Sequence, residues 1–355
     1  MKRFFLIITT FIFIISFIKC GSDSEKQDKN ENQESSITKN DTTIDISAIP
    51  MELNGDESFH LGYKFSKGNS FKYKLTTVTS TDQHIVTDST IDSKFEQKIT
   101  RILNFNTVSI ENDTVANLKC TITDINVYRN VDGKVVTYKS GDTLNSTDLN
   151  QFIEFKGIEN NPFNVNVSKQ GEIIKVYNIK GITDKFIELT NRKNNITQNE
   201  ISIFEQKLAE SFLEPMLSQI FRAIPDKDLK IGSNWQKEMA PTKVMSFTIL
   251  YRTKYNLDNI EKIKADKIAL ITGNADISVE GDTKMVDRGV EYNFQKPVTS
   301  AGGEIYFNID KGLLYKSNTG TKLDLKFKMQ MQGPKGLMKA NTTRNVTNKS
   351  IAELL

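Results

Sequence analysis

Apolar residues recur at every second position over most of the chain from Phe59 onward. In GNSFKYKLTTVTS these positions are Phe71, Tyr73 and Leu75, and DTVANLKCTITDINVYRN alternates in the same way, with one shift of phase near Asp124. A period of two places apolar side chains on one face of an extended strand, whereas a helix needs a period near 3.6. The stretches FTILYRTKYNLDNIEKI, DKIALITGNADISVE, EIYFNID and TKLDLKFKMQMQ share this period. The folded region, residues 59–355, is therefore predicted to be mainly β.

Short turns between these runs indicate how the strands are connected. Asp132 and Gly133, in NVDGKV, separate two alternating runs. A two-residue type I′ turn needs positive φ at both central positions, which Asp-Gly tolerates, so a β-hairpin is predicted here. Regular strands joined by short turns favour an antiparallel fold, either a sandwich or a partly open barrel.

One region, residues 184–224, breaks the period of two. Thr197 and Glu200 have the spacing of a capping box, which marks the first turn of a helix. Apolar residues then follow at helical spacing: Ile201, Phe204, Leu208, Phe212, Met216 or Leu217, and Ile220. Pro215 is predicted to kink this helix and Pro225 to stop it. A central helical insertion is expected, with a shorter helix at TDKFIELTN before it.

The apolar stripe of this helix has two interpretations. It can be ordinary core packed on a sheet, or a lid over an apolar cavity.

A weak internal repeat in the sequence also has two interpretations. Gly68, DTVANL and Gly171 recur in order as Gly232, DKIALI and Gly312. Either two related β units, about 59–180 and 230–340, flank the helices, or hairpins with a central glycine recur by chance.

The N-terminus, MKRFFLIITTFIFIISFIKC, predicts an export signal. Lys2 and Arg3 precede an apolar run that ends at Ile18, which is shorter than the roughly 20 residues of a membrane span. The segment resembles a bacterial lipoprotein signal, which implies cleavage of residues 1–19 and attachment of lipid to Cys20. Phe, Ile and Lys occupy the three positions before this cysteine, where such signals usually carry Leu and small residues. A single N-terminal anchor helix is the alternative.

Residues 20–58 are predicted to form a disordered tether. They are Ser, Asn, Gln, Lys, Asp and Glu with single apolar residues between, too little apolar surface to offset the entropy of ordering. From Gly21 to Ser58 there are ten acidic and three basic residues, so the folded region keeps a mild positive excess. It contains no basic run, and nucleic acid is not an expected partner.

No motif in the chain indicates catalysis. Its two histidines, His60 and His84, lie in polar surroundings, and Cys120 is expected to be a small buried hydrophobe. NIDKGLLYKSNT lacks the spacing of a calcium loop and is interpreted as a turn. We therefore expect no catalytic residue, no metal and no cofactor.

A second resemblance covers most of residues 59–330. YKFSKGNSFKYKLT, IPDKDLKIGSNW and GGEIYFNIDKGLLY resemble a group of uncharacterised bacterial lipoproteins of Bacteroidetes type, known only as a domain of unknown function. That resemblance implies no assigned site. A looser fold analogy is to periplasmic and outer-membrane carriers of lipoproteins, in which a curved sheet and a helical lid enclose an apolar cavity.

The expected function follows from these features. We expect a membrane-anchored lipoprotein of the cell envelope that binds an apolar or amphipathic ligand without catalysis. The alternative is a structural or protein-interaction lipoprotein with a fully packed core. Gly21, rather than Asp, follows Cys20. This is similar to lipoproteins that are forwarded to an outer membrane, which is the expected location.

Overall fold

The computed structural model describes residues 49–50, 57–192, 195–239, 241–333 and 336–355. Residues 49–355 form one compact unit. The predicted signal peptide and Cys20 lie outside the described residues, as does most of the predicted tether. The account below concerns the compact unit alone.

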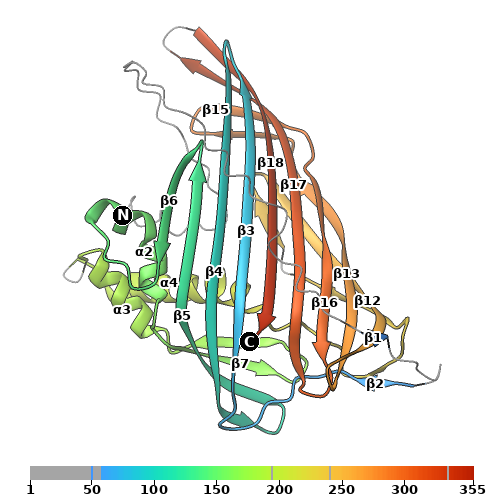
Figure 1. Cartoon of the computed structure of the whole chain (residues 1–355). Coiled ribbons are helices and arrows are strands. Elements are labelled where there is room, and N and C mark those ends of the chain that lie inside the picture. The colour runs from blue at the N-terminus through green and yellow to red at the C-terminus, as the bar shows by residue number, and fades with distance from the viewer. Residues whose placement is uncertain (1–48, 51–56, 193–194, 240, 334–335) are drawn as a thin grey trace, which may run out of the picture. The chain divides into compact units, whose positions relative to one another are not determined.

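A single antiparallel sheet of 16 strands dominates this unit (Figure 1). Its main path runs β1-β12-β13-β16-β17-β18-β3-β4-β5-β7-β8, and a separate small sheet pairs β2 with β9. The path has two free edges, so the sheet is open. The predicted mainly β, antiparallel fold is confirmed, in the partly open form rather than as two facing sheets.

Seven long strands, of 16 to 22 residues, form the body of the sheet. They are β3 (Ser70–Val86), β4 (Thr90–Glu111), β5 (Val115–Val131), β12 (Phe247–Ile263), β13 (Asp266–Gly281), β17 (Leu313–Gly333) and β18 (Gly336–Leu354). The shorter strands are β1 (Ile49–Pro50), β2 (Phe59–His60), β6 (Lys134–Lys139), β7 (Phe163–Ser168), β8 (Ile173–Tyr177), β9 (Asp228–Leu229), β10 (Asn234–Glu238), β11 (Thr242–Val244), β14 (Lys284–Asp287), β15 (Val290–Phe294) and β16 (Val298–Asn308). The last strand, β18, pairs with β3 over 14 residue pairs and so joins the two halves of the sequence.

The predicted Asp-Gly hairpin is confirmed. Val131 of β5 pairs with Lys134 of β6, which leaves Asp132 and Gly133 as the two loop residues. Their φ angles are +51° and +86°. Both values lie in the left-handed region that a type I′ turn requires.

The central helical insertion is also confirmed. It comprises α3 (Lys180–Leu189), α4 (Gln198–Leu208), a π-helical turn η1 (Ala209–Leu213) and α5 (Glu214–Leu217). Thr197 caps α4, since its hydroxyl accepts from Glu200 N–H while the Glu200 carboxylate accepts from Thr197 N–H at 2.9 Å. Figure 1 shows α2, α3 and α4 gathered at one end of the sheet, beside β5 and β7.

Three details of the helices differ from the prediction. Pro215 stands in the first turn of α5, which follows the π-helical turn η1. Proline has no backbone N–H to donate, and the wider π-helical turn accommodates the missing hydrogen bond. The helix ends at Leu217 rather than at Pro225; Phe221 N–H still donates to Leu217 O, and the next N–H, that of Arg222, donates to a side chain instead. Tyr63 Oη donates to Ile220 O at 3.2 Å and accepts from Arg222 N–H at 2.7 Å. A further helix, α2 (Ser146–Ile158), was not predicted; Asn145 caps it by accepting from Thr147 N–H and Asp148 N–H.

The core lies between this helical cluster and the sheet. The rings of Phe105, Tyr73, Phe71 and Phe221 contact one another at centroid distances of 5.1 to 6.2 Å. Most of the apolar helix residues are buried: Phe204, Leu208, Leu213, Met216, Leu217 and Ile220. The helix is therefore packed as core on the sheet. Cys120 is fully buried, as expected, and burial raises the pKa of its thiol.

Equivalent turns recur in the two halves of the sheet. Gly68 N–H donates to Thr107 O and Gly232 N–H donates to Leu257 O, both at 2.8 Å, and both glycines have a φ of +83°. Each acceptor directly precedes a β-bulge, in β4 and β12 respectively. The local geometry of the proposed repeat is thus the same in both halves. Descent of the two halves from one duplicated unit stays a prediction.

Candidate functional site

The helices define an inner face of the sheet. Ser317 of β17 and Ser350 of β18 donate to Gln219, which follows α5, and Arg222 donates to Thr319 of β17 at 3.2 Å. Directly paired residues on neighbouring strands lie on the same face, and every second residue along a strand returns to it. The unbroken register of β17, β18, β3 and β4 therefore assigns the inner positions of all four strands.

Acidic residues are missing from these inner positions. They are Ser317, Thr319, Thr321, Leu323, Leu325, Phe327, Met329 and Met331 of β17, and Met338, Ala340, Thr342, Arg344, Val346, Asn348, Ser350 and Ala352 of β18. On β3 they are Leu75, Thr77, Thr79, Thr81, Gln83 and Ile85, and on β4 Ile91, Ser93, Phe95, Gln97, Ile99 and Arg101. The intervening outer positions carry Lys, Asp and Glu. The inner face of these four strands thus has two cations, Arg101 and Arg344, and no carboxylate.

The chemistry of the inner face changes along the strands. At the helix-packed end Leu75 and Ile99 are buried, and the Arg101 guanidinium lies over the rings of Phe155 and Phe212 at 5.7 and 5.9 Å. The middle is polar. There Thr79 Oγ1 donates to Asn348 Oδ1 at 2.9 Å and Asn348 Nδ2 donates to Thr321 Oγ1 at 3.3 Å. The far end is apolar.

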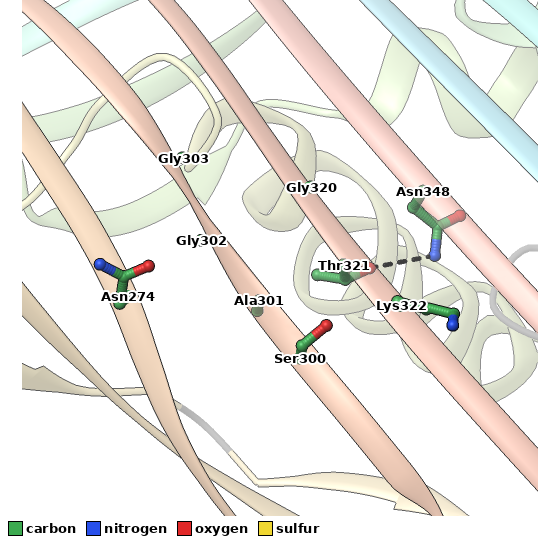
Figure 2. Close-up of a pocket in the computed structure, with 9 residues that line it drawn as sticks. All are labelled: Asn274, Ser300, Ala301, Gly302, Gly303, Gly320, Thr321, Lys322 and Asn348. Carbon is green, nitrogen blue, oxygen red and sulfur yellow. Dashed lines mark hydrogen bonds between the residues drawn. The ribbon is translucent and has the colours of Figure 1, made fainter.

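A shallow pocket of about 400 Å³, open to solvent, lies in the polar middle (Figure 2). Its lining is Asn274, Ser300, Ala301, Gly302, Gly303, Gly320, Thr321, Lys322 and Asn348. By register, Thr321 and Asn348 belong to the inner face and Lys322 to the outer one, and the three glycines of the lining have no side chain to fill the space. Lys322 is its one titratable side chain, and hydroxyl and amide groups make up the rest of its polar lining.

The apolar far end consists of Leu325, Phe327, Met329 and Met331 of β17 with Met338 of β18; we call it the apolar strip. Leu325 belongs to a buried cluster with Phe247, Tyr292 and Phe294, and Phe327 and Met329 pack on that cluster. Met331 and Met338 are 38% and 50% exposed. The strip is thus half core and half solvent-accessible surface.

Arg344 stands at the end of the apolar strip that is nearer to the helices, beside Leu325. Its cross-strand partners are Leu325 on β17 and Gln83 on β3. Its Nε donates to Gln83 Oε1 at 2.8 Å, and Nη2 contacts the same oxygen. Partial burial lowers the pKa of this guanidinium, and among the described residues no carboxylate pairs with it. Arg344 is a partly buried cation whose charge is not neutralised.

Two other guanidinium groups lie deeper. Burial lowers the pKa of Arg101 to about 10, although the negative charge of Glu154 opposes this shift. Burial also lowers the pKa of Arg222, which lies near the hydroxyls of Tyr255 and Tyr63. In the described part of the chain, Nε of each has no hydrogen-bond partner. Arg101 lies beneath rings of α2 and η1, and Arg222 belongs to the segment that follows α5.

A carboxylate beside this interior comes from a helix. Glu154 of α2 lies 3.4 Å from Arg129 of β5, and the Arg129 guanidinium also stands 5.6 Å from the ring centre of Phe152. Burial raises the pKa of Glu154, and the charges of Arg129 and Arg101 reduce that rise. The acid-free property therefore belongs to the sheet positions alone.

The histidines and the turn singled out in the sequence contribute no site. His60 and His84 are exposed and lie beside carboxylates, with His84 Nδ1 at 2.5 Å from Asp92. The NIDKGLLYKSNT stretch is a turn in which Asn308 and Asp310 accept from the backbone N–H groups of Lys311 and Lys267. Over the described ranges, no cluster of three or more His, Cys, Asp or Glu side chains could hold a metal ion. In the same ranges, no helix combines the length and apolar character that crossing a membrane would require.

The sequence contained a signal for the inner cations that the prediction did not use. In β4, Arg101 has the same phase as Ile99 and Leu103, and both of these are buried. In β18, Arg344 has the same phase as Thr342 and Val346. A cation at an inward position of an alternating strand marks a charge beside the core.

Fold and site together define a class: an open antiparallel sheet with an acid-free inner face, packed by helices at one end and accessible at the other. The chain belongs to a family of unknown function, DUF6263, whose model matches residues 113–314. No functionally curated protein matches its sequence.

Several solved structures are weakly similar. Lipovitellin, from a study of lipid–protein interactions, is 12% identical over 82% of this chain with a TM-score of 0.40, and the chain spans 25% of that protein. The COG4313 outer membrane channel of Pseudomonas putida F1 is 6% identical over 82% of this chain and 97% of its own, with a TM-score of 0.17. The Pseudomonas aeruginosa protein OccK2, in complex with glucuronate, is 6% identical over 79% and 96%, with a TM-score of 0.19. At these scores the likenesses carry no weight for function.

Proposed function

We propose that this protein is a non-catalytic lipoprotein of the cell envelope that binds an amphipathic ligand on the inner face of its sheet. The carrying observation is the accessible end of that face, where exposed methionines lie beside a polar, acid-free surface. Exposed contiguous apolar surface on a soluble unit commonly marks a binding site. The signal-like N-terminus and the proposed lipid on Cys20 support a location in the cell envelope.

A ligand of this kind matches the gradient along the inner face. The partly buried Phe327 and Met329 offer apolar contact, while Thr321 and Asn348, which pair with each other nearer the helices, offer hydroxyl and amide groups. A molecule with an apolar and a polar part could satisfy both regions at once. A purely apolar molecule would leave the polar row unused.

The first experiment is native mass spectrometry of residues 49–355, the compact unit, followed by extraction with organic solvent. We expect a lipophilic molecule to travel with the protein and to appear in the extract. The result that would overturn the proposal is an empty unit that also fails to take up added amphiphiles.

The proposed anchor is tested separately in the full chain. Replacement of Cys20 by Ser should remove lipid mass from the mature N-terminal peptide and shift the protein from the membrane fraction to the soluble fraction. A Cys120→Ser variant is the matched control, because this buried thiol is the other cysteine of the chain. Unchanged membrane attachment in C20S would favour the N-terminal anchor helix instead.

The packed helices favour one second candidate. Phe204, Leu208 and Leu217 are buried against the sheet, so the helical insertion packs as core in this structure. That is the arrangement expected of a structural or protein-interaction lipoprotein. Crosslinking in membranes would then capture stable protein partners, while the extract of the purified unit stays free of lipid.

A further inference from the structure

We infer that the ligand is an anionic amphiphile, with its charged group on Arg344 and its acyl chain along the apolar strip. This inference rests on the proposed function and deepens it by naming the ligand class. It depends on two features that the proposed function does not use, an unneutralised cation and the length of the strip, together with the acid-free inner face.

Charge complementarity determines the sign of the ligand. A partly buried cation normally has a carboxylate partner, because desolvation of an isolated charge is costly. Arg344 has only the amide oxygen of Gln83, and the inner positions of the four central strands supply no acid. An incoming anion would meet an unopposed cation, whereas an incoming cation would meet Arg344 with no compensating charge.

Guanidinium geometry suits the two common anionic headgroups. The Gln83 bonds use Nε and Nη2, which leaves the Nη1 donors without a described protein partner. Guanidinium groups bind carboxylate and phosphate oxygens through charge-assisted bonds roughly twice as strong as neutral ones. A carboxylate and a phosphate are therefore both compatible with this position.

The apolar strip has the dimensions of one acyl chain. From Leu325 to Met331 the strand advances six residues, or about 20 Å. One acyl chain accounts for half of the roughly 30 Å hydrocarbon core of a bilayer, or about 15 Å. The chain would start beside Arg344, which pairs with Leu325, and run toward the pair of Met331 and Met338.

The test uses three ligands with the same oleoyl chain: oleate, 1-oleoyl lysophosphatidate and the neutral monoolein. Each is titrated as a monomer against residues 49–355 by calorimetry. We expect at least one of the anions to bind about tenfold or more tightly than monoolein, as a charged hydrogen bond implies. Tighter binding of oleate would identify a carboxylate headgroup, and tighter binding of lysophosphatidate a phosphate.

Three variants locate the headgroup. Arg344→Met keeps the apolar stem and removes the charge, so it should weaken the anion about tenfold and leave monoolein unchanged. Arg344→Lys should retain part of the preference. Arg252→Met is the matched control: Arg252 is 56% exposed on β12, pairs with Glu238 and carries the same charge. Circular dichroism checks that each variant is folded.

Each negative result has a distinct meaning. Equal binding of all three ligands would overturn the anionic class and leave the proposed function standing. Anion preference that survives R344M, or that R252M weakens equally, would overturn the position on Arg344. Failure of all three ligands to bind would overturn both proposals, and a stable dimer that hides Met331 and Met338 would assign the strip to a second copy of the chain.

Discussion

The two ends of the inner face hold similar side chains in opposite circumstances. At the helix-packed end Arg101 is buried beneath aromatic rings of α2 and η1, and Phe105 lies among three further rings. At the far end Arg344 is only partly buried, and the apolar strip ends in exposed methionines. The same sheet thus serves as core at one end and as surface at the other.

The difference comes from the chain segment laid over each end. Helices and the Gln219–Arg222 segment cover the first end, and their aromatic side chains displace water from it. At the far end β12 and β15 add apolar side chains to the buried cluster, through Phe247, Tyr292 and Phe294. The strands alone therefore do not determine which end is core. The comparison predicts that truncating a side chain lowers the free energy of unfolding strongly at the helix-packed end and weakly at the far end.

The largest expected effect is on stability at the helix-packed end. Phe105→Ala removes a ring that is 1% exposed, so the free energy of unfolding should fall by about 3–5 kcal/mol. Phe327→Ala, the same change in the half-buried apolar strip, should cost clearly less. Urea denaturation of residues 49–355 measures both. Equal losses would mean that the far end is as fully packed as the other.

The sequence allowed more of the fold to be predicted than of the site. Alternation in β3, β4 and β5, the Asp-Gly turn and the Thr197 capping box all depend on residues close together in the chain. These were confirmed. The α2 helix was missed because its apolar residues gather in its second half, from Phe152 to Ile158, and so show almost no helical periodicity.

The site depends on pairings between distant residues, which one sequence does not reveal. Arg344 meets Gln83, 261 positions away, only because β18 pairs with β3. The absence of acid becomes visible only when the inner positions of four strands are collected on one face. The break in helical bonding at Arg222 N–H, after α5, likewise involves Tyr63, a residue more than 150 positions earlier. Long-range register, rather than local propensity, defines the candidate surface.

A second prediction concerns the two cations. Burial lowers the pKa of Arg101 from 12.5 to about 10, which corresponds to a destabilisation of its charged form by roughly 3 kcal/mol. Contacts of the guanidinium with the two aromatic rings stabilise it by about 2 kcal/mol. Arg101→Met should therefore raise the free energy of unfolding by about 1 kcal/mol, because Glu154 keeps Arg129 as its ion-pair partner and is not left as an uncompensated buried charge. Arg344→Met should change it by less than about 0.5 kcal/mol. A clear loss of stability in R101M would show that the ring contacts outweigh desolvation.

The smallest expected effect is a pH dependence confined to the helix-packed end. Burial raises the folded-state pKa of Glu154 above its usual value of 4.5. In the window above pH 4.5 the folded state then holds more protons than the unfolded state, so the free energy of unfolding falls as pH rises. Glu154→Gln should make this slope less steep, because the amide does not titrate. Glu188→Gln, the same change on a side chain that is 69% exposed, is the control. Denaturation at several pH values distinguishes E154Q from E188Q.

Since the inner positions of β17, β18, β3 and β4 carry no acid, Arg344→Met should leave the pH slope unchanged. A slope that changes equally in E154Q and E188Q would contradict its assignment to the acid that α2 brings to the inner face.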